Sequence, residues 1–197
     1  MINLPVMTLR IFLLFGLSCL IFILFSCSND HSDIDRKAFG SIDFGVRKSE
    51  YYKKIDTILP KFKELDEHKI GKFRFTQIEP EFHADSLIKL TIHGVHYVGY
   101  STFSEDYNAI FKSLSEKYGE PSVVFNDPAK LTSDKLGNFL ATTWSSGFKE
   151  IEFRFCKYPE EEYKILMIIQ DTFAKYAIES ERIDYNAKES NKIKDIL

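Results

Sequence analysis

The sequence predicts an α+β domain, with helices packed on one face of an antiparallel sheet, after an N-terminal signal or anchor helix. Apolar residues recur at helical spacing in separate stretches, and runs of alternating segments follow those stretches instead of interleaving with them one by one. The chain has 197 residues, of which 28% are charged and 44% hydrophobic, as in globular proteins. We expect a single domain over residues 39–197 with one substantial core.

The N-terminal leader contains an apolar run of 15 residues, IFLLFGLSCLIFILF (11–25), preceded by the positive charge of Arg10. At about 1.5 Å per residue such a helix spans roughly 22 Å, which is shorter than the ~30 Å hydrocarbon core of a bilayer. Its length and charge are typical of a signal peptide and predict the removal of residues 1–26. An uncleaved anchor, or a secretory signal with an incidental cysteine, is the alternative.

The leader ends in Leu24, Phe25, Ser26 and Cys27. This sequence resembles the lipobox of bacterial lipoprotein precursors, although Phe25 stands where that pattern favours a small or β-branched residue. The resemblance implies a diacylglyceryl group on the Cys27 sulfur, cleavage before Cys27 and often a third acyl chain on the new amino group. Two or three acyl chains hold a soluble domain on a bilayer, whereas one chain binds only reversibly.

Residues 27–38 are expected to form an acidic tether, because SNDHSDIDRKA has no hydrophobic periodicity. Such stretches are similar to those that follow the lipid cysteine in surface-exposed lipoproteins of the Bacteroidetes group. The predicted location is therefore the bacterial cell envelope, with the domain periplasm-facing or surface-exposed. Without the leader the chain has 25 basic and 29 acidic residues, which argues against a broad basic face for nucleic acid.

A helix and a strand are expected after the tether. Apolar residues recur at helical spacing over 51–65, so one stripe faces a partner, and Pro60 is expected to kink or end the first part. The following KFRFTQI alternates strictly, as a half-buried strand does. Phe73, Phe75 and Gln77 are then expected on one side of that strand.

A second strand and the clearest helix come next. The segment LIKLTIHGVHYVGYS (87–101) alternates until its phase shifts near Gly94, which predicts a bulge or a turn. Thr102 or Ser104 can cap the helix that follows, and Gly119 ends it. The buried stripe of this helix is expected to be Tyr107, Ile110, Phe111, Leu114 and Tyr118.

Four strands and a final helix complete the predicted body. The first three strands are SVVF (122–125), FLATTWSS (139–146) and KEIEFRFCKY (149–158). The fourth, YKILMIIQ (163–170), is apolar on both faces, which marks a central covered strand. The charged C-terminal stretch predicts a helix. This arrangement is similar to that of small envelope domains of the β-lactamase-inhibitor-protein-like class in element order alone, and no residue role carries over.

The five histidines suggest two places for a metal ion. On a regular strand His93 and His96 would point to opposite faces, unless Gly94 forms a bulge. His83 lies in EPEFHADS, which we expect to be a loop with three carboxylates, Glu79, Glu81 and Asp85. Zinc and calcium motifs have tighter spacing, so a solvated loop is favoured and neither a metal nor another cofactor is predicted.

Signatures of catalysis are missing from the sequence. It has no G-x-S-x-G elbow, S-x-x-K motif, G-x-G-x-x-G loop or P-loop. Cys19 would leave with the leader and Cys27 would be acylated, so Cys156 would have no disulfide partner and is interpreted as a small strand residue. Residues 160–162 are interpreted as a solvated turn between strands and not as a carboxylate dyad.

The predicted function is that of a membrane-anchored envelope lipoprotein with a non-enzymatic binding or accessory domain. Its expected partners are the membrane, through the acyl chains on Cys27, and an envelope protein, peptide or glycan. Trp144 with Tyr97, Tyr100 and Tyr158 could form an aromatic platform, although burial in the core is the default for such residues. The alternative function is a lipid-anchored hydrolase whose active site is assembled from distant residues.

Overall fold

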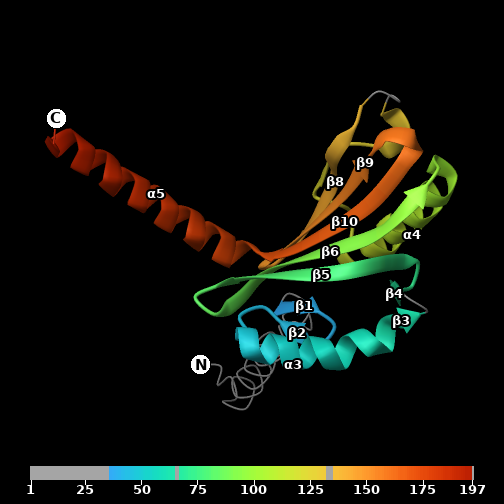
Figure 1. Ribbon diagram of the computed structural model, residues 1–197, viewed down its shortest axis with the longest axis horizontal. Helices are drawn as coiled ribbons and strands as arrows, with labels where there is room; N and C mark the ends of the chain where they lie inside the picture. The colour runs from blue at the N-terminus through green and yellow to red at the C-terminus, as the bar shows by residue number, and fades with distance from the viewer. Residues whose placement is uncertain (1–35, 65–66, 132–134, 197) are drawn as a thin grey trace, which may run out of the picture. The chain divides into compact units, whose positions relative to one another are not determined.

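The computed structural model describes residues 36–64, 67–131 and 135–196, so Cys27 and the predicted leader lie outside the described residues. From Asp35 onward the chain is one compact unit. Its helices and antiparallel strands confirm the predicted α+β class (Figure 1). The domain begins before the predicted boundary at residue 39, because the first strand starts at Lys37 and Ala38 is buried in the core.

The described strands are β1 Lys37–Phe39, β2 Ile42–Asp43, β3 Lys63–Glu64, β4 Glu67–Ile70, β5 Phe73–His83, β6 Ser86–Val98, β7 Val123–Val124, β8 Gly137–Ser146, β9 Lys149–Lys157 and β10 Glu162–Asp171. The helices are α3 Lys48–Ile58, α4 Tyr100–Tyr118 and α5 Thr172–Ile196, with 3₁₀ turns η1 Leu59–Phe62, η2 Pro128–Lys130 and η3 Pro159–Glu161.

The main sheet contains eight strands in the order β3-β4-β5-β6-β10-β9-β8-β7, and β1 and β2 form a separate pair. Each half of the sheet is therefore a four-strand meander that follows a helix, α3 for the first and α4 for the second. The two meanders meet through their last strands, β6 and β10, which pair antiparallel. The internal position of β10 confirms the prediction that this strand is central, but Ile168 is only partly buried, so the strand is not fully covered on both faces as predicted.

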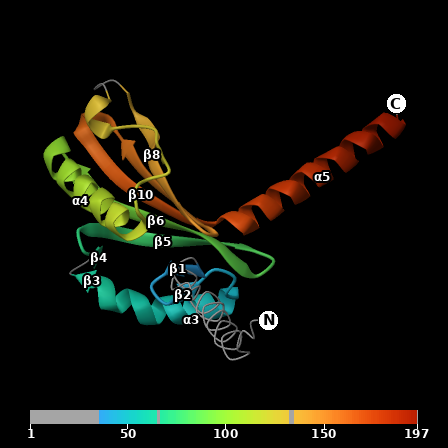
Figure 2. The same ribbon diagram turned by 180° about the vertical axis from the view of Figure 1, so that it is seen from behind.

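Helix α4 covers one face of the sheet. Its buried residues Phe103 and Tyr107 stack on Tyr163 and Phe153, with ring centroids 4.6 Å and 4.8 Å apart. Such pairs contribute about 0.5–1.5 kcal/mol each beyond the apolar area they bury. Figure 2 shows α4 in front of the sheet from this side. The predicted stripe is confirmed, and we call this side of the sheet the packed face.

The ends of α4 fit the sequence only in part. Gly119 is the C-cap, as expected. The helix begins at Tyr100, however, so Thr102 and Ser104 lie inside the helix and neither is the N-cap. Gly99 takes that position without any side-chain capping bond, and its φ of 85° is one that glycine adopts without strain. The prediction of a hydroxyl cap was wrong because the chain turns into the helix at this glycine.

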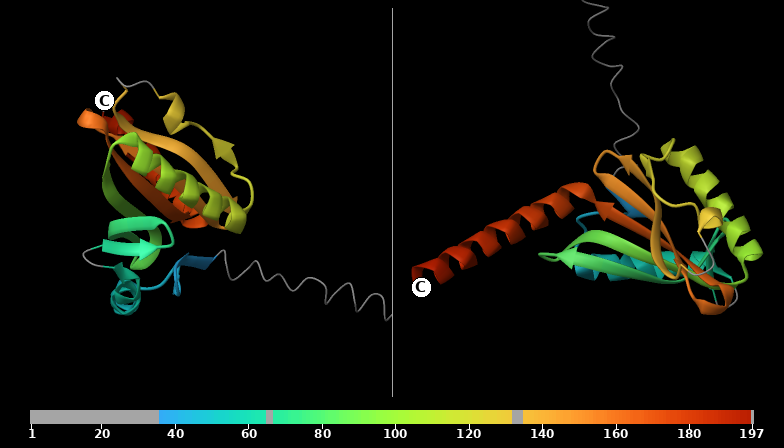
Figure 3. Two further views of the ribbon diagram at one scale, coloured as in Figure 1. Left: turned by 90° about the vertical axis from the view of Figure 1, so that its right-hand side faces the viewer. Right: turned by 90° about the horizontal axis from the view of Figure 1, so that it is seen from above.

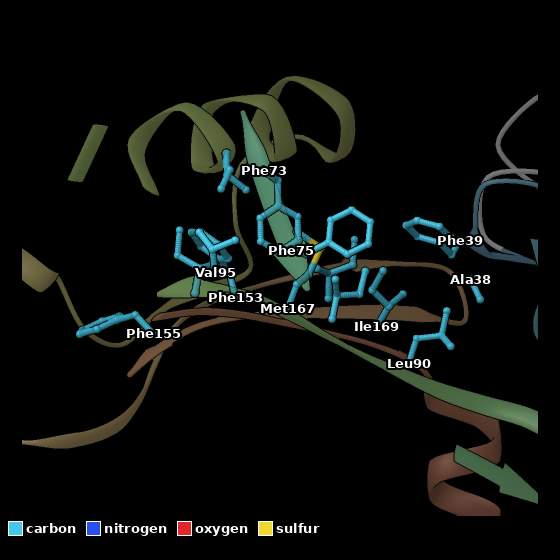
Figure 4. Close-up of a cluster of buried hydrophobic side chains, with 14 of the residues drawn as sticks. Ala38, Phe39, Phe73, Phe75, Leu90, Val95, Phe153, Phe155, Met167 and Ile169 are labelled. Carbon is cyan, nitrogen blue, oxygen red and sulfur yellow. The ribbon is translucent and has the colours of Figure 1, made fainter. Parts of the chain in front are cut away.

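Helix α3 and the β1–β2 pair complete the core. Tyr51 of α3 meets Phe82 of β5 edge to face, with ring centroids 5.5 Å apart. Phe39 of β1 contacts both Phe62 and Phe75, at 5.8 Å and 6.3 Å. Figure 4 shows Phe39 beside the cluster formed by strand side chains. The helix predicted over 51–65 is confirmed as far as Ile58, where α3 ends; Pro60 lies in the 3₁₀ turn that follows, and Lys63–Glu64 is a strand instead of helix.

Strand β5 extends further than expected and replaces the loop predicted around His83. Only its first three residues pair with β4, so the rest of β5 forms an edge, where the missing N–H of Pro80 breaks no ladder bond. A register shift between Phe75 and Gln77 also moves Gln77 to an exposed position, which corrects the prediction that it shares a side with the two phenylalanines.

Helix α5 continues directly from β10. The right-hand view of Figure 3 shows α4 along the sheet and α5 leaving the end of β10 away from α4. Its first turn is capped by Asp171, whose Oδ1 accepts hydrogen bonds from the backbone N–H groups of Phe173 and Ala174. The predicted C-terminal helix is confirmed. None of the helices in the described part of the chain has the length and apolar character that crossing a membrane requires.

Candidate functional site

The side of the sheet opposite α4 carries most of the ordered polar groups. In β9, Phe153 and Phe155 point toward α4, so Glu152 and Arg154 point the other way. In Figure 1 this second side faces the viewer and α4 lies behind the sheet. We call it the open face. Its polar side chains include Glu79, Glu81, Lys89, His93, His96, Glu150, Glu152, Arg154, Glu162, Lys164 and Gln170.

A bulge at Gly94 places two histidines on the open face. A Cβ atom at position 94 would lie 2.7 Å from the carbonyl oxygen of Ile165 in β10, which is too close for any residue but glycine without a shift of the backbone. The accompanying register shift sets two residues of β6, Gly94 and Val95, against one residue of β10, Ile165. His93 and His96 therefore lie opposite residues of β10 that share one face, which settles the alternative that the sequence left open.

Each of these histidines faces a carboxylate. Nε2 of His93 lies 3.1 Å from Oε2 of Glu79 on the neighbouring strand β5. Nδ1 of His96 lies 4.0 Å from Oε2 of Glu162, and its ring stacks on that of Tyr158 with centroids 5.6 Å apart. Either contact is an ion pair only when the imidazole is protonated.

The cluster expected around His83 is not assembled. His83 instead lies 3.5 Å from Glu181 of α5, and Glu81 forms an ion pair with Lys89 across the β5–β6 ladder. Asp85 lies in the hairpin turn and accepts a hydrogen bond of 3.3 Å from the backbone N–H of Lys48. Within residues 36–64, 67–131 and 135–196, no three His, Cys, Asp or Glu side chains are grouped so that they could hold a metal ion.

An amide and two carboxylates form the most connected part of the open face. Nε2 of Gln170 donates to Glu150 and to Oε1 of Glu152, the latter at 3.2 Å. Nη1 of Arg154 lies 2.7 Å from Oε2 of Glu152, and Nζ of Lys175 lies 3.0 Å from Oε1 of Glu150. Strands β9 and β10 and the first turns of α5 are thus joined by one polar network.

The contact with Glu150 changes the pKa of Lys175. Partial burial acts to lower the pKa of this ammonium group, but the hydrogen bond and negative charge of Glu150 outweigh it, and the pKa is raised. Lys175 therefore stays charged at neutral pH and compensates Glu150. Because the carboxylates of the open face each contact a cation, an amide or an imidazole, this face presents donors and acceptors without a large net charge.

The predicted aromatic platform does not exist, because its main members belong to the core. Trp144 and Tyr97 are only 1% and 2% exposed. The indole Nε1–H of Trp144 donates to the carbonyl oxygen of Gly119 at 3.1 Å, and the Tyr97 hydroxyl bonds to Asp106 at the same distance. Of the four expected members, Tyr158 alone lies beside the open face, through its stack on His96. Burial was the correct interpretation.

Two further expectations are confirmed. Cys156 is a buried residue of β9, and burial raises the pKa of its thiol, which keeps the sulfur protonated and unreactive. Residues 160–162 lie at the η3 turn, where Glu160 and Glu161 adopt positive φ and are exposed to solvent. They form a turn between β9 and β10 and do not face each other as a catalytic pair.

Sequence reasoning did not identify the Gln170 network. The alternation of KEIEFRF already places the two glutamates and the arginine on one side of a strand, which was the available signal. Gln170 is the last residue of an apolar run, so the sequence did not single it out. Its contacts depend on the register between β9 and β10. Comparison with known proteins finds no family model, curated protein or solved structure that matches this chain.

Proposed function

We propose that this protein is a lipid-anchored protein of the bacterial cell envelope whose α+β domain binds a partner through the open face, without catalysing a reaction. The anchor rests on the lipobox-like sequence that ends in Cys27. The domain serves as the periplasm-facing or surface-exposed part. Its partner is an envelope protein, a peptide or a glycan, and acyl chains on Cys27 keep the domain near that partner.

The observation that carries the binding role is the fixed network around Gln170. The side chains of Glu150, Glu152 and Arg154 are only 22%, 18% and 25% exposed, so their neighbours restrict them. Polar groups that are already positioned lose little conformational entropy when a ligand binds, which favours association. A face of compensated charges also suits a neutral, hydrogen-bonding ligand better than it suits a polyanion.

Charge reversal on the open face tests this proposal. Arg154→Glu removes the contact with Glu152, and Glu79→Lys changes a half-exposed position that does not support the core. Lys112→Glu is the matched control, because Lys112 is 78% exposed on α4. The acylated protein and the three variants are immobilised and used to capture ligands from the envelope of the same cells.

The proposal expects a protein or glycan that is retained by the wild type and by Lys112→Glu and lost with both open-face variants. Equal retention by all four proteins would show that the open face is not the binding surface. Circular dichroism of each variant excludes loss of the fold as the cause of a negative result.

A further inference from the structure

The positive charge of the domain is concentrated next to its N-terminal end. Residues 36–74 contain 11 basic and six acidic residues, a net of +5, whereas residues 75–197 contain 14 basic and 20 acidic ones, a net of −6. Strands β1 to β4, α3, η1 and the start of β5 form this part, and they lie together in Figure 1, coloured blue to teal. We call residues 36–64 and 67–74 the N-terminal layer.

Several cations of the N-terminal layer are exposed to solvent. In this layer Lys54 forms an ion pair with Glu50, and Arg74 lies within ion-pair distance of Glu67 and Asp106. Elsewhere in the described chain six cations form ion pairs with carboxylates, namely Lys89, Lys112, Lys130, Arg154, Lys175 and Arg182. Exposed cations of the layer without an ion pair to a described residue are Arg36, Lys37, Lys53, Lys61, Lys63 and Lys72.

The layer is one packed unit and contains the start of the described chain. Phe39, close to that start, contacts Phe62 of η1, and α3 packs against β2 and β6. Only nine residue steps separate Cys27 from Arg36. Nine residues span at most about 30 Å in any conformation. If Cys27 carries acyl chains in a bilayer, the layer is held within reach of the headgroups.

We propose that the N-terminal layer docks on anionic lipid headgroups of the membrane that holds the anchor. This inference rests on the proposed lipid anchor and adds a second, electrostatic contact to it. Each lysine or arginine near a negatively charged bilayer strengthens binding about fivefold, and the attraction decays within a Debye length of about 8 Å at physiological salt. These exposed cations therefore favour an orientation in which the N-terminal layer faces the membrane.

Lysine footprinting on vesicles tests the orientation inside a single molecule. The acylated protein is reconstituted into vesicles of phosphatidylcholine alone or with phosphatidylglycerol, labelled with a water-soluble acetylating reagent and analysed by mass spectrometry. Lys53, Lys61 and Lys63 report on the layer, while Lys112 and Lys130, which are 78% and 83% exposed, serve as internal controls.

Docking predicts that anionic vesicles slow the labelling of Lys53, Lys61 and Lys63 relative to neutral vesicles and leave Lys112 and Lys130 unchanged. High salt should remove this protection. A triple variant, Lys53→Gln with Lys61→Gln and Lys63→Gln, should abolish the protection of Lys37 and Lys72, whereas Lys112→Gln with Lys130→Gln should not.

Flotation with neutral vesicles distinguishes failure of this inference from failure of the proposed anchor. A protein that floats with neutral vesicles but shows no anion-dependent protection is anchored and does not dock through this layer, which overturns the inference alone. A protein that does not float with neutral vesicles lacks the anchor, and the proposed function fails together with the inference. Protection caused only by an added acidic protein, and not by anionic lipid, would assign the layer to a protein partner instead and contradict the proposal.

Discussion

His93 and His96 lie on the same face of the sheet although they are three positions apart in the chain, because the bulge at Gly94 adds one residue to β6. His93 faces Glu79 and His96 faces Glu162, so the bulge gives the open face both of its histidine–carboxylate contacts. A regular strand would send one of the two rings into the packed face, where α4 and the aromatic core leave no room for a charged side chain.

Replacing Gly94 by alanine should lower stability by about 1–3 kcal/mol, the usual cost of an overpacked site. The added methyl group would meet the carbonyl oxygen of Ile165 at 2.7 Å and force β6 and β10 apart. Urea unfolding of the wild type and of Gly94→Ala measures the difference. An unchanged midpoint would mean that the close approach of β6 to β10 at this position is wrong.

Aspartate substitutions along β10 should distinguish the two faces of the sheet by how much stability each one costs. Ile165 is completely buried on the packed face, so Ile165→Asp should cost about 3–5 kcal/mol by placing an unpaired charge in the core. Ile168 lies on the open face with intermediate exposure, and Ile168→Asp should cost clearly less. Thermal melting of both variants measures these costs. Equal losses of stability would contradict the assignment of the two residues to different faces.

Stability should decrease in alkaline solution because of buried tyrosines. Burial raises the pKa of Tyr51 from its usual value of 10 to about 12, with a smaller contribution from the nearby Tyr52. Between these two values the folded state binds more protons than the unfolded state, so the free energy of unfolding is undiminished below pH 10 and falls as the pH rises toward 12.

Denaturant titrations from pH 8 to pH 11.5 measure this loss. Tyr51→Phe should show a shallower decline above pH 10 than the wild type, while Tyr176→Phe, which changes an exposed tyrosine of α5, should follow the wild type. Parallel curves for the wild type and Tyr51→Phe would show that ionisation of Tyr51 does not contribute to alkaline unfolding.

The histidines should not bind zinc stoichiometrically. His83, His93 and His96 each face one carboxylate, and the three contacts lie at different places, whereas a structural zinc site needs four ligands around one point. Elemental analysis of protein purified without chelator should give well under one equivalent. One equivalent of zinc that disappears in His93→Ala would overturn this expectation.

Local patterns were sufficient for the helices and for most strands. The stripe of Tyr107, Ile110 and Phe111 specifies the buried side of α4 because its spacing is set by the helix itself. The length of β5 could not be read in this way, since Pro80 is compatible with a strand only at an edge, and the edge exists because β4 is short. Sequence periodicity does not contain that information.

The side chains that meet on the open face could not be predicted without the alignment of neighbouring strands. Gln170 reaches Glu150 and Glu152, which are 20 and 18 residues away in the chain, because β9 and β10 pair with one particular alignment. A slip of one residue would turn all of these side chains to the other face. Alternation showed which residues of β9 share a side, but the partners on β10 and α5 depend on an alignment that the turn at η3 sets.

The intact mass of the membrane-extracted protein tests the central claim, a lipid anchor at Cys27, most directly. We predict a chain that begins at Cys27 and carries the added mass of a diacylglyceryl group, with or without a third acyl chain. Cys27→Ser should lack this mass and should either be released in soluble form or stay as the unprocessed precursor. An unmodified wild-type chain that begins at Met1, or one cut elsewhere with a free Cys27 thiol, would contradict the account.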